Sequence, residues 1–153
     1  MKEKLMNLNE FLIKAKVSGY ATGGEGKEIK LDDGGLKFLY KENDLVYSDI
    51  YYGFNPFAGQ ELVRKGNKVI WMLNYYGKSF YPQDEIIQIY RFLKKALQKP
   101  ENGLPLRGPK KFSDNNFEYS NIVNGDMGFF SGKEEILEGE KLIYELYYHG
   151  GNL

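Results

Sequence analysis

The chain contains no cysteine among its 153 residues, which excludes disulfides, thiol catalysis and thiolate metal sites. A cysteine-free sequence suits a reducing compartment, so we expect a cytoplasmic protein. Histidine is almost as scarce, since His149 is the single one, and this excludes any metal site that needs two histidines. We therefore expect neither a metal nor another cofactor.

An excess of charge of one sign is also missing, because 21 Lys and Arg residues balance 21 Asp and Glu residues. General nucleic-acid binders usually carry a basic surplus, so we do not expect this function. No apolar run approaches the ~20 residues that a membrane helix requires, and the N-terminus lacks the apolar centre of a signal peptide. The remaining partners are a small molecule or another protein.

Aromatic residues, by contrast, are plentiful at 16%, with 13 Tyr and 10 Phe. Helical spacing of apolar residues predicts a helix over 8–17, begun by Asn7 as N-cap, and a second helix after Pro82. Alternating residues between short turns predict antiparallel strands. The predicted strands are 36–41, 45–52, 60–64, 68–76, 109–113, 117–124, 133–137 and 141–149.

The second half of the chain repeats a pattern of the first. Matching pairs include Tyr47 and Tyr119, Asp49 and Asn121, Glu61 and Glu134, and Trp71 and Tyr144. We predict an α+β fold in a single domain, 1–153, with an internal duplication over about 7–78 and 82–151. Each repeat is a helix plus a four-stranded antiparallel meander, with the helices packed on one sheet or on two facing sheets. The alternative is a chance likeness between two meanders.

The repeat separates the two faces of its last strand. On one face Val69, Trp71, Leu73 and Tyr75 match Leu142, Tyr144, Leu146 and Tyr148. On the other face Met72, Asn74 and Tyr76 match Glu145, Tyr147 and His149. The first face kept its character, which predicts a core position, because interiors are tightly packed. The second face changed, which indicates either a solvent face or a specialised site.

Several motifs occur together along the chain. They are Phe11-Leu12, Phe57-Ala58-Gly59, Arg107-Gly108-Pro109, Val123-Asn124-Gly125-Asp126, Phe129-Phe130 and Tyr148-His149-Gly150-Gly151. In these motifs the chain resembles an uncharacterised bacterial and archaeal domain family. Members of that family occur alone or behind a helix-turn-helix regulator module, which we do not expect here because about seven residues precede the first helix. The resemblance implies a sensor-like or partner-binding role and no catalytic residues.

Our leading hypothesis is a binding module with an aromatic pocket between the two repeats. Pockets lined by aromatic rings with a few polar groups are the usual form of a small-ligand site. The candidate liners are Tyr20, Tyr51, Trp71, Tyr76, Arg107, Asp126, Tyr147 and His149. One alternative is a protein–protein interaction module of a regulator. The other is a hydrolase-like enzyme that uses Glu134 or Asp126 with His149.

Two further questions concern charged residues. Glu61 and Glu134 occupy matching positions, so they form either an acid/base pair or two separate structural contacts with backbone donors. Arg107 lies between Pro105 and Pro109, where it either binds an anionic ligand or is held by a carboxylate such as that of Asp126.

Overall fold

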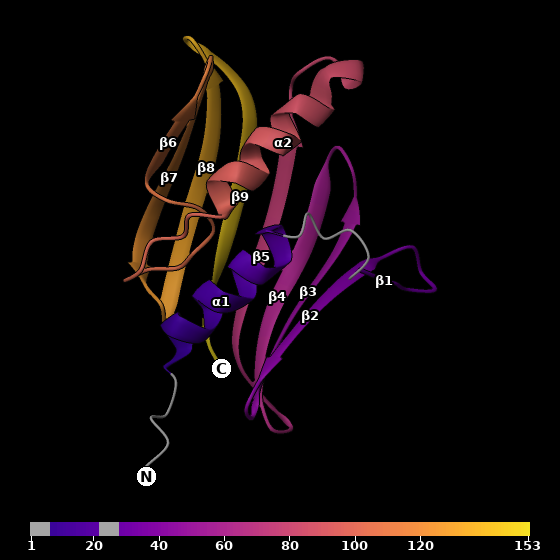
Figure 1. Ribbon diagram of the computed structural model, residues 1–153, viewed down its shortest axis with the longest axis vertical. Helices are drawn as coiled ribbons and strands as arrows, with labels where there is room; N and C mark the ends of the chain where they lie inside the picture. Colours follow the sequence, from indigo (N-terminus) through magenta and orange to yellow (C-terminus); the bar gives the residue numbers. More distant parts are fainter. Residues whose placement is uncertain (1–6, 22–27) are drawn as a thin grey trace.

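The computed structural model describes residues 7–21 and 28–153, without the side chains of Tyr20 and Ala21. The elements in chain order are α1 (Leu8–Ala21), β1 (Ile29–Lys30), β2 (Leu36–Glu42), β3 (Leu45–Gly53), β4 (Phe57–Lys65), β5 (Lys68–Ser79), the 3-10 turn Gln83–Glu85, α2 (Ile86–Leu97), β6 (Lys111–Asp114), β7 (Phe117–Asp126), β8 (Phe129–Glu138) and β9 (Lys141–Asn152). Figure 1 shows both helices lying in front of the strands.

All strands of the described residues belong to one antiparallel sheet. Their spatial order is β1-β2-β3-β4-β5-β9-β8-β7-β6. Neighbouring strands are therefore also neighbours in sequence, except at the centre, where β5 pairs with β9. That pairing runs from Trp71 opposite Asn152 to Ser79 opposite Tyr144, with Tyr75 opposite Tyr148. The two longest strands thus join the two halves of the chain into one sheet.

The predicted architecture, in which a helix and a four-stranded meander recur as a unit, is wrong. The described residues form one nine-stranded sheet with two short helices of 14 and 12 residues. The helices contact each other, and α1 lies against β2 and β3 while α2 also reaches β7. Apolar alternation indicates which face of a strand is buried, but it does not indicate which strands pair. The prediction failed because strand pairing is set by backbone hydrogen bonds, which leave no pattern in the sequence.

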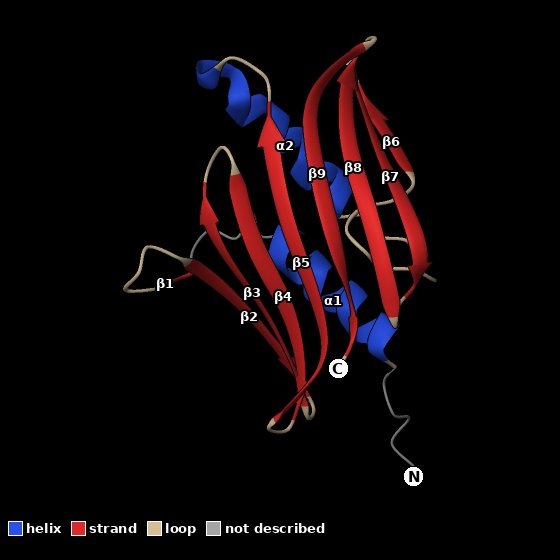
Figure 2. Ribbon diagram, turned by 180° about the vertical axis from the view of Figure 1, so that it is seen from behind, coloured by secondary structure: helices blue, strands red, loops and turns tan. Residues whose placement is uncertain are grey.

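Both helices cover the same face of the sheet (Figures 1 and 2). Helix α1 begins after Asn7, whose side-chain oxygen accepts the Glu10 N–H at 2.8 Å, as predicted for an N-cap. The buried residues of α2 recur every three or four positions: Ile86, Ile89, Phe92, Leu93, Ala96 and Leu97. None of the described helices is long and apolar enough to cross a membrane.

The helix-covered face forms the core, and the prediction for β5 and β9 is confirmed at three of the four positions on each strand, since Val69 and Leu142 are only half-buried. Trp71, Leu73 and Tyr75 are buried on β5, and Tyr144, Leu146 and Tyr148 are buried on β9. Side chains between them point to the opposite face, which no described helix covers (Figure 2). We call this opposite side the open face.

Two tyrosine rings lie flat across glycines of neighbouring strands. Gly59 is opposite Tyr75, and Gly132 is opposite Tyr148. A Cβ atom at Gly59 would come within 2.3 Å of the Tyr75 oxygen, and one at Gly132 within 2.0 Å of the Tyr148 ring. Glycine is therefore required at both positions so that the rings can reach across to polar partners on the next strand.

Replacement of Gly132 by Ala should destabilise the protein by about 1–3 kcal/mol, because the Tyr148 ring has to move within a packed core. Urea unfolding measures the change. Gly103→Ala is the matched control, since a Cβ atom there meets nothing within 4 Å, and its effect should stay within about 0.5 kcal/mol. Equal stability of Gly132→Ala and Gly103→Ala would contradict this account of the ring packing.

Candidate functional site

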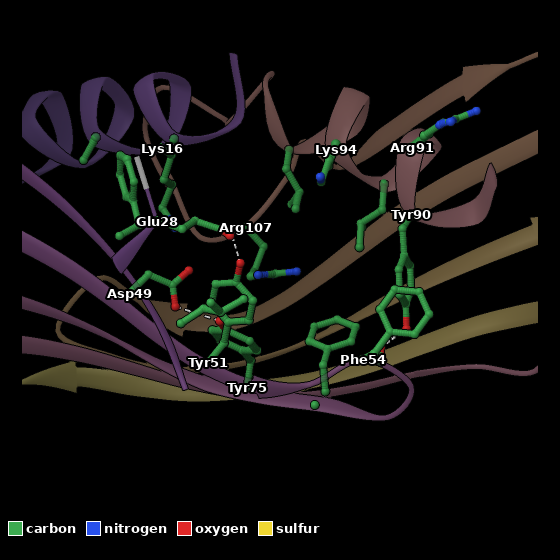
Figure 3. A pocket seen from close by; sticks show the side chains of 18 of the residues that line it. Lys16, Glu28, Asp49, Tyr51, Phe54, Tyr75, Tyr90, Arg91, Lys94 and Arg107 are labelled. Carbon is green, nitrogen blue, oxygen red and sulfur yellow. Dashed lines mark hydrogen bonds between the residues drawn. The ribbon is translucent and has the colours of Figure 1, made fainter. Parts of the chain in front are cut away.

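A cavity of about 570 Å³ lies between the two helices and the sheet, over strands β2 to β5 (Figure 3). Aromatic side chains supply most of its wall: Phe38, Tyr47, Tyr51, Phe54, Phe57, Tyr75 and Tyr90. Charged side chains line it as well: Lys16, Glu28, Asp49, Arg91, Lys94 and Arg107. A site of this size and composition suits a small molecule that has a flat body and a few polar groups.

Asp49 is the buried acid of this cavity, with 9% of its surface exposed. Its Oδ1 accepts a hydrogen bond from the hydroxyl of Tyr75 at 2.7 Å (Figure 3). Burial, and then the neighbouring charge of Glu61, raise the pKa of Asp49 from 3.8 to about 7. The carboxyl group therefore exchanges its proton near neutral pH, which is uncommon for an aspartate and typical of functional sites.

Glu61 lies beside Asp49 on the adjacent strand and binds Lys16 of α1. The ammonium group of Lys16 contacts Oε1 at 2.7 Å, and the hydroxyl of Tyr47 donates to the same oxygen. Burial raises the pKa of Glu61, but the charges of Lys16 and Arg107 and the hydrogen bonds from Lys16 and Tyr47 together outweigh burial and lower it. Glu61 is therefore a carboxylate, and its pairing with Lys16 ties α1 to the sheet.

Glu134 has the corresponding arrangement in the second half of the chain. Arg107 donates to its Oε1 from Nε at 3.1 Å and from Nη2 at 2.9 Å, and Tyr119 donates to Oε2. All three groups are buried. The guanidinium of Arg107 also lies 5.0 Å from the ring centre of Tyr75, so it borders the cavity from the second half. Arg107 is thus held by a carboxylate, although by Glu134 rather than Asp126.

Glu61 and Glu134 do not form an acid/base pair. Glu61 is on β4 and Glu134 is on β8, so strands β5 and β9 lie between them. Each glutamate instead accepts hydrogen bonds from one cationic side chain and from buried tyrosine. Their role in this structure is to neutralise a buried cation, because a buried charge without a partner is very costly.

Asn121 stands where Asp49 stands in the first half, and here the two halves differ. Tyr148 donates to the Oδ1 of Asn121 at 2.7 Å, as Tyr75 does to Asp49. The amide nitrogen of Asn121 donates to the backbone oxygens of Leu106 and Gly108, at 2.8 and 3.0 Å. The loop around Arg107 thus covers Asn121, whereas Asp49 borders the cavity.

Two tyrosines of the cavity wall keep their hydroxyl protons at neutral pH. Burial, and then a hydrogen bond to Glu28, raise the pKa of Tyr51. Burial raises the pKa of Tyr90 to about 12, and its hydroxyl donates to the backbone oxygen of Phe54 at 2.6 Å. These rings consequently act as hydrogen-bond donors rather than as bases.

The structure divides the eight residues that the sequence suggested as liners. Tyr51 and Arg107 line the cavity. Trp71 lies in the core, where its indole N–H donates to the Met127 oxygen at 3.0 Å. Asp126 accepts the backbone N–H groups of Gly128 and Phe129 in the turn before β8. The side chain of Tyr20 lies outside the described residues.

The other three suggested liners lie on the open face. Tyr76 and Tyr147 are paired neighbours on β5 and β9, 56% and 54% exposed. His149 is exposed two residues further along β9, so it points to the same side. Glu134 is buried on the helix-covered face. The sheet therefore separates His149 from Glu134, and these two groups do not share a cleft.

Sequence reasoning missed the residues that make the cavity distinctive, above all Lys16 and Asp49. A signal was present for Asp49, because aspartate is uncommon within strands and the residue that matches it in the predicted repeat, Asn121, is an amide. A lysine following Ala15 on the apolar side of a helix is a second signal. The cavity wall combines α1 and strands β2 to β5 with α2 and Arg107, so segments of both predicted repeats contribute to it.

Comparison with known proteins identifies the family. The model of a domain of unknown function, DUF5680, matches residues 49–153. The chain belongs to this family. The matched segment starts at Asp49 and includes Arg107, whereas Lys16 and the rest of α1 precede it. No curated protein and no solved structure matches the chain.

Asp49→Asn should make stability less dependent on pH. The raised pKa means that the folded state holds the Asp49 proton more tightly than the unfolded state, so this stabilisation is complete below pH 3.8 and is lost as the pH rises through about 7. Relative to Asp49→Asn, wild-type stability should fall by up to about 1.4 kcal/mol per pH unit between these values. Denaturant unfolding from pH 4 to 8 measures the difference, and parallel curves would contradict it.

The reverse exchange, Asn121→Asp, provides the matched comparison. An aspartate cannot donate to the oxygens of Leu106 and Gly108, and it places a second acid near Glu134. This variant should lose about 2–4 kcal/mol of unfolding free energy at pH 8. If Asn121→Asp is as stable as wild type at pH 8, the contacts of Asn121 with the loop do not contribute to the unfolding free energy.

Proposed function

We propose that this chain is a cytoplasmic small-ligand-binding module of sensor type, with its ligand in the cavity between the helices and strands β2 to β5. The observation that carries the proposal is the buried acid Asp49 in the wall of an aromatic cavity. A strongly shifted pKa beside a cavity is characteristic of functional sites. The compartment follows from the lack of cysteine, which favours a reducing environment.

The surroundings of Asp49 support binding over a purely structural role. Asn121, its counterpart, donates both amide hydrogens to the loop around Arg107 and accepts a hydrogen bond from Tyr148. Among the described residues, Tyr75 is the one side chain that donates to Asp49. A ligand in the cavity can supply contacts that the loop supplies in the second half. Its size is limited to that of a nucleoside or a smaller molecule by a volume of about 570 Å³.

A thermal-shift screen of nucleotides, amino acids, sugars and small aromatic compounds tests the proposal. A ligand present at a hundred times its Kd should stabilise the protein by about 2.7 kcal/mol, which raises the Tm by several degrees. Leu36→Trp should abolish the shift, because Leu36 lines the cavity and the larger ring fills it.

Leu39→Trp is the control. Position 39 is on the same strand as Leu36, but its side chain points to the opposite face, because side chains alternate along a strand. This variant should keep the shift. A shift that survives Leu36→Trp locates the ligand elsewhere, and a screen without any hit contradicts the proposed function.

A protein–protein interaction role is the second candidate, favoured by the open face. Tyr76, Ile122, Phe129 and Tyr147 are exposed by 56, 62, 86 and 54%. Exposed apolar groups in such numbers often mark an interface. A double change of Tyr76 and Tyr147 to Ser should then release a protein that co-purifies from the native host, whereas Asp49→Asn should retain it. Retention by the double variant rejects this role for the open face.

A further inference from the structure

The buried polar groups next to the cavity have more hydrogen-bond acceptors than donors. Glu61 is 2% exposed, and its Oε2 has no hydrogen-bond partner among the described residues. Asp49 lies directly opposite Glu61 across β3 and β4, and Tyr75 donates to one of its two oxygens. Buried acceptors without donors cost free energy, so this end of the cavity favours a group with several N–H or O–H donors.

The charges lead to the same conclusion. Lys16 and Arg107 are already neutralised by Glu61 and Glu134, with contacts of 2.7 and 2.9 Å. These four buried charges cancel, and an ionised Asp49 leaves one negative charge over. A proton on Asp49 can neutralise this charge. A cationic group of a ligand can do the same and would also provide donors.

We propose that the ligand carries a protonated amine, which binds against the carboxylate of Asp49 and replaces the proton there. This inference rests on the proposed binding function and specifies its ligand class. Three rings of the cavity wall favour such a cation: Tyr51, Phe57 and Tyr75. Aromatic faces attract cations within about 6 Å, most strongly where water is excluded.

The other end of the cavity differs in charge. Arg91 and Lys94 line it from α2, and both are exposed. Figure 3 shows Asp49 and Arg91 at opposite ends of the view, with Tyr75 and Phe54 between them. The amine therefore binds at the end of the cavity where Asp49 lies, and the body of the ligand extends along the rings towards α2.

Proton release makes amine binding depend on pH. The charged and titratable groups of the described residues that face Asp49 are Lys16 from α1, Tyr51 from β3, Glu61 from β4, Tyr75 from β5 and Arg107 from the loop after α2. Of these, Glu61 has a lowered pKa and Tyr51 a raised one, whereas the pKa of Asp49 is raised to about 7, so Asp49 is the group that titrates near neutrality. The affinity for an amine should therefore rise as the pH increases from 6 to 8.

Three compounds with the same ring test the proposal: 2-phenylethylamine, 2-phenylethanol and 3-phenylpropanoate, which are cationic, neutral and anionic. Calorimetry with the full chain at pH 8 should give at least about tenfold tighter binding of the amine than of the alcohol, and weakest binding of the acid. Asp49→Asn should remove about a factor of ten for the amine, leave the alcohol within about twofold and abolish the pH dependence.

Asparagine at position 49 can still accept from Tyr75, as Asn121 does from Tyr148, so this variant should fold. Glu145→Gln removes one acid from the open side of β9 and should leave all three affinities unchanged. Equal binding of amine and alcohol, or an amine preference that persists in Asp49→Asn, would overturn the amine class and leave the binding function intact. If none of the three compounds binds, the amine class is overturned, and the ligand screen separately decides the binding function.

Discussion

The pairing of β5 with β9 determines most of the architecture. Each of these strands is the last of its own run of hairpins, and each would be an exposed edge without the other. Their hydrogen bonds join the two runs into one sheet that is broad enough for α1 and α2 to lie side by side on one face. The cavity exists because two helices cover a sheet of this breadth without filling all the space above β2 to β5.

Neutralisation of buried charge then fixes the residues around the cavity. Glu61 forms an ion pair with Lys16 of α1, and Glu134 forms one with Arg107 of the loop after α2. Each ion pair therefore connects the sheet to a segment that covers it. Buried pairs of this kind contribute little net stability, but removal of one partner is costly, and they therefore specify position. Among the described residues no cationic side chain forms an ion pair with Asp49. Glu61 and Glu134 are each paired with a buried cation, and Asp49 is the buried carboxyl group for which this pairing is missing from the described residues.

Much of the fold was predictable from local sequence. Strands β2, β3, β5, β7 and β9 lie within a few residues of their predicted ranges, and the buried face of β5 was correctly predicted from alternation. The β5–β9 pairing was not predictable, because backbone groups make it between distant segments. The same reason explains why only part of the site was predictable. Tyr51 and Arg107 were identified from the sequence, but the contact of Lys16 with Glu61 spans 45 positions and has no local signature.

The position of Trp71 has a practical consequence. It is the one tryptophan in the chain, it is fully buried on β5, and its indole donates to Met127 in the turn between β7 and β8 beside the Phe130 ring. The indole therefore touches both halves of the protein and does not line the cavity. Its fluorescence is a built-in spectroscopic reporter of whether the two halves are joined, and it separates that event from occupation of the ligand site.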